Sequence, residues 1–137
     1  MPLEALHEAL FRYTPDAEYV LDLTSNRFLL VNDAFLRLLG CSREEMPGLS
    51  PEDLVFPEER EAFRVRKMDA SPPVSESYVL KALRKDGTRL AIELSVHRLS
   101  LGGRPLVLGS ARDITQRLRQ TELGLRHQAA LLHLAQE

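Results

Sequence analysis

The sequence has little of several features that mark particular classes of protein. Cys41 is its only cysteine, so no internal disulfide can form and a cysteine-rich zinc site is excluded. No apolar run reaches the roughly 18 residues that cross a bilayer. The start of the chain, with an acid already at Glu4, does not resemble a signal peptide. These absences predict a cytoplasmic protein that does not span a membrane.

A concentrated positive charge is also missing. The 18 basic and 20 acidic residues are interspersed and give a net charge of -2, whereas a nucleic-acid surface normally needs a strong positive field. Of the 137 residues, 44% are hydrophobic and 28% are charged, which is an ordinary balance for one folded domain. We therefore expect neither a nucleic-acid partner nor a membrane partner.

The motifs of common enzymes and metal sites are absent as well. The chain contains no Gly-x-Ser-x-Gly, no glycine-rich phosphate loop and no His-Glu-x-x-His. His127 and His133 are six residues apart, which does not match the i, i+4 spacing of a helical metal pair. The sequence predicts no enzyme and no metal site, and a catalytic site assembled from distant residues is the alternative.

The first half of the chain is predicted to contain a helix, a strand hairpin and several short helices. An amphipathic helix is expected over residues 2–12. Its apolar stripe consists of Leu3, Leu6, Leu10 and Phe11. Short strands are expected at 18–23 and 27–31, around a polar turn. Short helices are expected at 34–39, from 42, from 50 and from 57 to about 70, each after a polar or proline cap.

The second half changes from helical spacing to alternation. Strands are expected at 74–84, 88–99 and 104–114, joined by an Asp-Gly turn and a Gly-Gly turn. The middle strand places Leu90, Ile92, Leu94 and Val96 on one face, which predicts an antiparallel sheet with one buried face. A final helix is expected over 115–137, with leucines every seven residues, as in a coiled coil. The predicted fold class is α+β, with a five-stranded antiparallel sheet and short helices inserted after the second strand.

Four segments in this order resemble the PAS domain family. They are VNDAF at 31–35 followed by LGCSREE at 39–45, DLVFPEER at 53–60, RKDGT at 84–88 and RDIT at 112–115. The resemblance implies a flanking helix at 1–13, a PAS core at 14–115 and a signalling helix at 116–137. It identifies the fold more firmly than a function, because one fold hosts many functions.

The resemblance also implies where function would reside. PAS domains commonly hold a ligand between the concave sheet face and the small helices, and plain hydrophobic core is the alternative for each residue there. The expected inward-facing residues are Leu30, Phe63, Met68, Leu80, Leu94 and Val96. The expected signal relay is Arg112, Asp113, Ile114 and Thr115. The expected dimer contacts are Leu3, Leu6, Leu10, Phe11, Leu118, Leu125 and Leu132. Packing on the outer face of the sheet is the alternative for the first four. No buried charged partner for an anionic ligand is evident.

Two cofactor classes are not expected. Cys41 lies in Gly40-Cys41-Ser42 rather than in the Asn-Cys-Arg motif of flavin photosensors, and residues 57–70 contain no histidine for haem. The cofactor is therefore unassigned, with none expected. The sequence predicts a sensory, homodimeric module of a larger signal-transduction protein, such as a two-component system, with an effector domain in the same chain. The alternatives are a ligand-free interaction scaffold and a noncovalent flavin or haem sensor.

Overall fold

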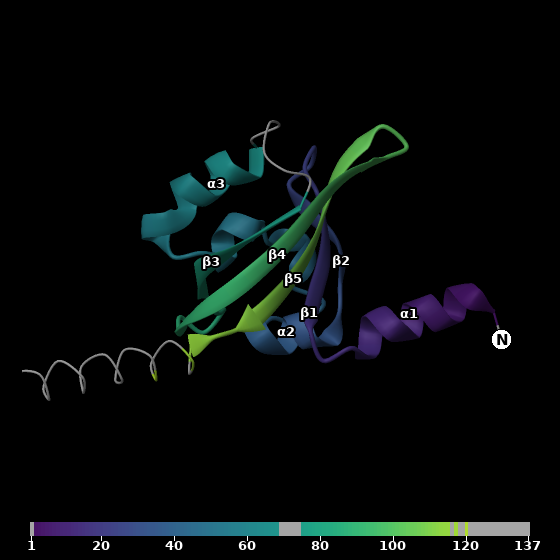
Figure 1. The fold of residues 1–137 in the computed structure, drawn as a ribbon. Helices are drawn as coiled ribbons and strands as arrows, with labels where there is room; N and C mark the ends of the chain where they lie inside the picture. Colours follow the sequence, from purple (N-terminus) through teal and green to yellow (C-terminus); the bar gives the residue numbers. More distant parts are fainter. Residues whose placement is uncertain (1, 69–74, 116, 118–119, 121–137) are drawn as a thin grey trace, which may run out of the picture.

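An antiparallel sheet is covered on one face by helices (Figure 1). The computed structural model describes residues 2–68, 75–115, 117 and 120. The strands are β1 (Ala17–Asp22), β2 (Arg27–Val31), β3 (Ser75–Leu83), β4 (Arg89–Leu101) and β5 (Arg104–Asp113). The helices are α1 (Leu3–Tyr13), α2 (Asp33–Leu39), the 3-10 helices η1 (Met46–Gly48), η2 (Pro51–Leu54) and η3 (Pro57–Glu59), and α3 (Arg60–Met68).

The strand order is β2-β1-β5-β4-β3, so the N-terminal hairpin lies beside the last strand of the chain. All four neighbouring pairs are antiparallel. The predicted five-stranded α+β arrangement is confirmed for the described residues. The predicted C-terminal helix over 115–137, with Leu118, Leu125 and Leu132, lies almost entirely outside the described residues.

Alternation along β4 decides which face of the sheet is buried. Leu94 is 2% exposed, whereas Ser95 and His97 on the opposite face are exposed. We call the face that carries Leu94 the inner face and the opposite one the outer face. The inner face packs against α2, η1, η2 and α3 in one hydrophobic core. This alternation is the one predicted from the sequence.

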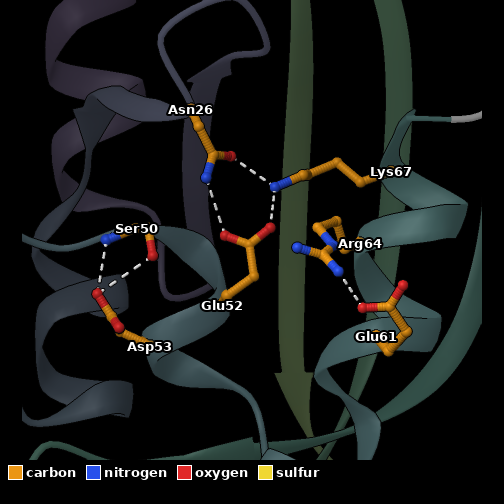
Figure 2. Close-up of polar contacts among 7 residues, drawn as sticks. All are labelled: Asn26, Ser50, Glu52, Asp53, Glu61, Arg64 and Lys67. Carbon is orange, nitrogen blue, oxygen red and sulfur yellow. Dashed lines mark hydrogen bonds and ion pairs between the residues drawn. The ribbon is translucent and has the colours of Figure 1, made fainter.

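The short helices begin and end at the capping residues that the sequence contains. Asn32 starts α2 by accepting a hydrogen bond from the Phe35 N–H at 3.0 Å, and Gly40 ends it with a left-handed φ of 67°. A reciprocal capping box between Ser50 and Asp53 starts η2 (Figure 2). The helix expected from residue 42 is instead a turn followed by η1, because Pro47 and Gly48 cannot continue an α-helix.

The helix α1 extends away from the rest of the domain (Figure 1) and has no buried residue. Asn32 anchors its C-terminal end, because the Asn32 side-chain amide donates to the carbonyl oxygens of Phe11 at 3.0 Å and Asp16 at 2.8 Å. Asn32 is 1% exposed, and its amide oxygen accepts from the Glu18 N–H of β1 at 2.9 Å and from the Phe35 N–H of α2 at 3.0 Å. One buried side chain therefore joins α1, β1 and α2.

Candidate functional site

The cleft between the inner face and the helices is largely filled by aromatic rings. Tyr19, Phe28 and Phe35 meet with ring centroids 5.3 to 5.6 Å apart. The Tyr19 ring lies directly over Gly109, its partner on β5, where an added Cβ would come within 2.1 Å of the ring. What remains is an apolar cavity of about 40 Å³. Only a glycine at this position of β5 allows this packing.

Four of the six residues expected to face the cleft do so. Phe63, Leu80 and Leu94 line the apolar cavity. Val96 lines a second, smaller cavity of about 10 Å³ in the same cleft. All four are at most 8% exposed, and each also packs in the hydrophobic core. Their burial agrees both with a ligand site and with plain core.

Leu30 does not face the cleft, and the expectation that it would is wrong. It is 57% exposed and pairs with Val20 on the outer face. The register between β1 and β2 shifts, so that Leu21 pairs with Phe28 and Leu29 is left as an extra residue. Because such a β-bulge inserts one residue into the alternation, Leu30 moves to the opposite face.

Met68 is also misplaced by the sequence prediction. It is 61% exposed, whereas Phe63 on the same helix is buried. Residues five positions apart on an α-helix point about 140° apart, since each residue turns the helix by 100°. The position that shares the buried face of α3 is Lys67, four residues after Phe63.

Lys67 forms a buried polar cluster at one end of the cleft (Figure 2). Its side chain is 6% exposed, and its Nζ donates to the Asn26 amide oxygen at 2.5 Å and to a Glu52 carboxylate oxygen. Asn26 also donates to Glu52 at 2.9 Å. Burial by itself raises the pKa of the Glu52 carboxyl, but the hydrogen bonds from Lys67 and Asn26 outweigh it and leave that pKa below its ordinary value. The cluster ties α3 to η2 and to the turn between β1 and β2.

A second cationic group lies beside Lys67 on the sheet. Arg98, at the end of the inner-face row of β4, pairs with Glu76 at 3.3 Å and donates to the Arg66 carbonyl oxygen at 2.9 Å. The Arg66 guanidinium lies 4.0 Å from the centroid of the Tyr78 ring. The polar groups that line the 10 Å³ cavity are Tyr19, Lys67, Tyr78 and Arg98. The cleft thus has an apolar end and a cationic end.

Sequence reasoning missed this cationic end. A lysine in the last turn of a helix usually complements the helix dipole in solvent, so Lys67 did not stand out. The signal that could have found it is its spacing from Phe63, since residues at i and i+4 share a helix face. Arg98 follows Leu94 and Val96 at the strand period of two, which places it on the inner face.

The predicted relay residues form a hydrogen-bonded junction at the end of β5. The Asp113 carboxylate accepts from the Thr115 N–H at 2.9 Å, as expected for this motif. The Thr115 hydroxyl accepts from the Ala91 N–H at 2.9 Å, and the Ile114 N–H donates to the Ala91 carbonyl oxygen at 2.9 Å. Ile114 itself is 3% exposed. The exit from the sheet is therefore held against β4, while Arg112 is exposed on the outer face.

Cys41 is 8% exposed within the core. Burial raises the pKa of its thiol, so the group stays protonated. Among the described residues, no group of His, Cys, Asp and Glu side chains is arranged to hold a metal ion. No helix in the described ranges is long and apolar enough to cross a membrane.

The outer face carries a hollow of about 660 Å³ whose edge is formed by Phe11 at the end of α1. Its floor is a row of small side chains that pair across the strands, Ser77 with Ser95 and Ser95 with Ser110. Apolar side chains beside it are exposed, including Leu108 at 41%. Along α1, Leu3, Leu6 and Leu10 are exposed as well, by 64%, 43% and 61%. The expected dimer residues of this helix therefore form an uncovered apolar stripe, and Phe11 is half-buried.

Comparison with known proteins places this architecture in a family. The chain is 25% identical over 108 residues to the methyl sulfide methyltransferase-associated sensor of Methanosarcina acetivorans, and the match covers 79% of this chain and 11% of that protein. A PAS domain from Colwellia psychrerythraea superposes with a TM-score of 0.73 at 23% identity, covering 84% of this chain and 99% of that one. A PAS domain from a two-component sensor histidine kinase gives a TM-score of 0.67 at 18% identity, covering 80% and 95%. The family model for the PAS domain matches residues 16–116. The chain belongs to the PAS domain family.

Proposed function

We propose that this chain is the sensory and dimerisation module of a larger cytoplasmic signal-transduction protein, with no catalytic role of its own. PAS domains are sensory modules, and the archaeal relative is named a sensor. The chain spans about a tenth of that relative's length, which fits a module that acts on an effector elsewhere in the same protein. A two-component system is the expected setting.

The observation that carries the proposal is the junction at the end of β5. The Thr115 hydroxyl accepts from the Ala91 N–H of β4 at 2.9 Å, and the Asp113 carboxylate accepts from the Thr115 N–H at 2.9 Å. These bonds hold the start of the following segment against β4. The Arg84 guanidinium adds a link, since it donates to the Leu38 carbonyl oxygen at 3.0 Å and lies 3.9 Å from the Asp113 carboxylate. A shift of α2 or of the sheet is therefore coupled to the first residues after β5.

The uncovered apolar surface of α1 supports a homodimer. Its leucines have no partner within the described part of the same domain, and the end of the helix borders the hollow of the outer face. Because the stripe and the hollow are adjacent, a second copy related by a two-fold axis can cover both at once. The other expected dimer contacts, Leu118, Leu125 and Leu132, lie outside the described residues.

Replacement of Leu6 and Leu10 by serine tests the dimer. We expect light scattering to report a mass near 31 kDa, twice the 15.5 kDa of the chain, for the wild type. The double variant should dissociate at protein concentrations at least about tenfold higher than the wild type. The reason is that burial of each exposed leucine in the dimer contributes roughly 1–2 kcal/mol of binding free energy. Glu4→Gln and Glu8→Gln on the same helix serve as controls. A variant that remains dimeric like the wild type would exclude α1 as the interface.

Replacement of Thr115 by valine tests the junction. Valine has the same shape as threonine but cannot accept a hydrogen bond from the Ala91 N–H. Hydrogen exchange at the Ala91 amide and in the residues that follow residue 115 should therefore accelerate. Ser110→Ala, on the outer face of β5, is the matched control. Equal exchange in Thr115→Val and in the wild type would refute a coupled junction.

The alternatives differ in what the cleft contains. A ligand-free scaffold would keep both cavities sealed and act through its surfaces. A noncovalent flavin or haem would require a much larger cavity than 40 Å³, since pockets for ligands of drug size measure about 300–1,000 Å³. Native mass spectrometry with an absorbance spectrum separates these cases: added mass without colour supports a small ligand, colour supports the cofactor, and neither supports the scaffold.

A further inference from the structure

One row of side chains on the outer face crosses all five strands. Residues paired directly on neighbouring strands point to the same face of a sheet. From β2 to β3, in the order of the sheet, the paired residues are Leu30, Val20, Leu108, His97 and Ser75. We call these five residues the outer row. Its first three members are apolar, and the β-bulge in β2 is what brings Leu30 into it.

The outer row borders the hollow of about 660 Å³, which four of its members help to line. The next row along the strands consists of small side chains, Ser77, Ser95 and Ser110. An apolar ridge therefore lies beside a floor of serines. This relief fits a helix that carries large apolar side chains along one stripe, and the exposed leucine stripe of α1 has that form.

A second copy of the chain is the occupant that the structure favours for this surface. The α1 of the same chain leaves the hollow uncovered, because Asn32 holds its C-terminal end and the helix extends away from the domain (Figure 1). Phe11, near the end of α1, lines the hollow, so the leucine stripe and the outer row form one continuous apolar surface. A two-fold axis allows the α1 of each copy to lie over the outer row of the other.

His97 is the one member of the outer row that changes its charge near neutral pH, since imidazoles titrate between pH 5 and 8. Its Nδ1 lies 2.6 Å from the Ser75 Oγ. This contact serves both charge states, because a hydroxyl donates to a bare Nδ1 and accepts from a protonated one. What differs between the states is the cost of burial. Leucines that cover the ring remove water from it, which disfavours the charged imidazolium.

The charged groups of the outer face offer His97 little compensation. The Glu76 carboxylate lines the same hollow but is paired with arginines of the inner-face cleft at 3.3 and 4.0 Å. Glu18 lies on β1, separated from β4 by the whole of β5. Glu93 and Arg112 lie beyond the serine row, where they pair with each other across the strands. An imidazolium covered at position 97 would therefore lack a carboxylate partner of its own.

The charged groups of α1 do not supply one either. Because each residue turns an α-helix by about 100°, Glu4, Glu8 and Arg12 point away from the leucine stripe. His7 borders the stripe, and its protonation would add a charge of the same sign as that on His97. The docked helix therefore presents mainly apolar side chains to the outer row.

We propose that dimerisation is gated by protons: α1 of a second copy covers the outer row while His97 is neutral, and protonation of His97 releases it. This proposal rests on the dimerising function proposed above and adds its regulation. The monomer keeps the imidazolium in water and so binds more protons than the dimer. A fall in pH therefore shifts the equilibrium toward monomers, and acidification is the signal.

The dissociation constant of the full chain at pH 7.5 and at pH 5.5, measured by sedimentation velocity over a dilution series, tests the gate. We expect it to rise at least about tenfold at pH 5.5, because a proton that must be lost on association weakens binding by up to tenfold per pH unit. Circular dichroism at both pH values distinguishes dissociation from unfolding. A wild-type dimer that is equally tight or tighter at pH 5.5 would overturn the gate.

His97→Gln keeps a polar side chain without the titration. It should form the dimer at pH 7.5 and change its dissociation constant less than about threefold at pH 5.5. An equal pH response in His97→Gln and the wild type would overturn the assignment. So would a response that His7→Gln abolishes and His97→Gln retains, since the gate would then lie on α1.

Glu18→Gln removes an effect that opposes the gate. Burial and the nearby Asp16 carboxylate raise the pKa of the Glu18 carboxyl, and a dimer that buries Glu18 further favours its protonated form. The pH response should therefore persist in Glu18→Gln and be at least as large as in the wild type. A response lost in this variant would place the gate on Glu18 and overturn the proposal.

Leu30→Ser and Leu29→Ser test the docking surface as a matched pair. The two leucines are neighbours on β2 and are exposed by 57% and 43%, but only Leu30 belongs to the outer row. At pH 7.5, Leu30→Ser should raise the dissociation constant about tenfold, and Leu29→Ser should leave it within about twofold of the wild type. Equal effects of the two substitutions would remove the outer row from the interface.

The two pH values also separate this proposal from the one on which it rests. A dimer that is equally tight at both values contradicts the gate alone and leaves the dimerising module in place. A chain that is monomeric at both values contradicts the dimerising module itself.

Discussion

The two faces of the sheet belong to the same strands but differ in how far their side chains are buried. The inner face is buried and tightly packed, with Leu94 2% exposed and a glycine beneath the Tyr19 ring. The outer face bears serines, a wide hollow and exposed apolar side chains such as Leu108. Because burial of apolar surface supplies most folding free energy, the inner face stabilises the domain. The outer face contributes less, since much of its apolar surface stays exposed.

The comparison is tested most strongly by truncating one leucine on each face. Leu94→Ala should lower the free energy of unfolding by about 3 kcal/mol, because it removes a fully buried side chain and leaves a cavity. Leu108→Ala should cost less than about 1 kcal/mol, since Leu108 is 41% exposed. Urea unfolding at concentrations where the protein is monomeric measures both. Equal losses would mean that the outer face is covered within a single chain.

Substitution at the polar end of the inner face should lower the free energy of unfolding nearly as much as Leu94→Ala. Lys67→Met should destabilise the protein by about 3 kcal/mol, because it leaves the Glu52 carboxylate without its cation in a largely buried position. Adding Glu52→Gln should recover most of the loss, since no unpaired charge then remains. The control is Arg64→Met: Arg64 pairs with Glu61 on the exposed side of the same helix (Figure 2), and its loss should cost under about 0.5 kcal/mol. A Lys67→Met loss no larger than that of Arg64→Met would contradict the buried cluster.

A single methyl group should also distinguish the two faces. Gly109→Ala places a Cβ against the Tyr19 ring and should cost about 2 kcal/mol, as overpacked core positions do. The near-ultraviolet circular dichroism of the tyrosines should change with it. Ser110→Ala, one residue later on the outer face, should stay within about 0.5 kcal/mol of the wild type. Similar behaviour of the two variants would mean that the Tyr19 ring adapts freely.

The smallest effect is expected at the rim of the inner face, where Glu45 pairs with Lys85 at 2.8 Å. Hydrogen bonds from Lys85 and Ser42 lower the pKa of the Glu45 carboxyl from 4.5 to about 2. Because the folded pKa lies below the unfolded one, the pair's contribution is fully present above pH 4.5 and is lost as the pH falls toward 2. Glu45→Gln should thus be slightly less stable than the wild type at pH 7 and equal to it near pH 2. Urea midpoints across this range measure the difference, with Glu44→Gln as the control, and a gap that stays constant with pH would refute the assignment.

Much of the fold could be predicted because it depends on local rules. Alternation along β4 placed Leu94 and Val96 on the buried face, and Asn32 and Gly40 marked the ends of α2. These signals are readable because side-chain direction in a strand and hydrogen bonding at a helix end depend on neighbouring residues alone. Leu30 was misplaced because the bulge at Leu29 arises from pairing with another strand.

The sequence by itself therefore determined the order of helices and strands, the inner face of the sheet and the junction at Asp113. Only the tertiary structure decided what fills the cleft. The position of the Tyr19 ring depends on Gly109, which is 90 residues away in the chain, and the partners of Lys67 come from a turn and a short helix that precede it by 41 and 15 residues. Such contacts follow from the packing of elements against one another, and neither periodicity nor capping carries information about them.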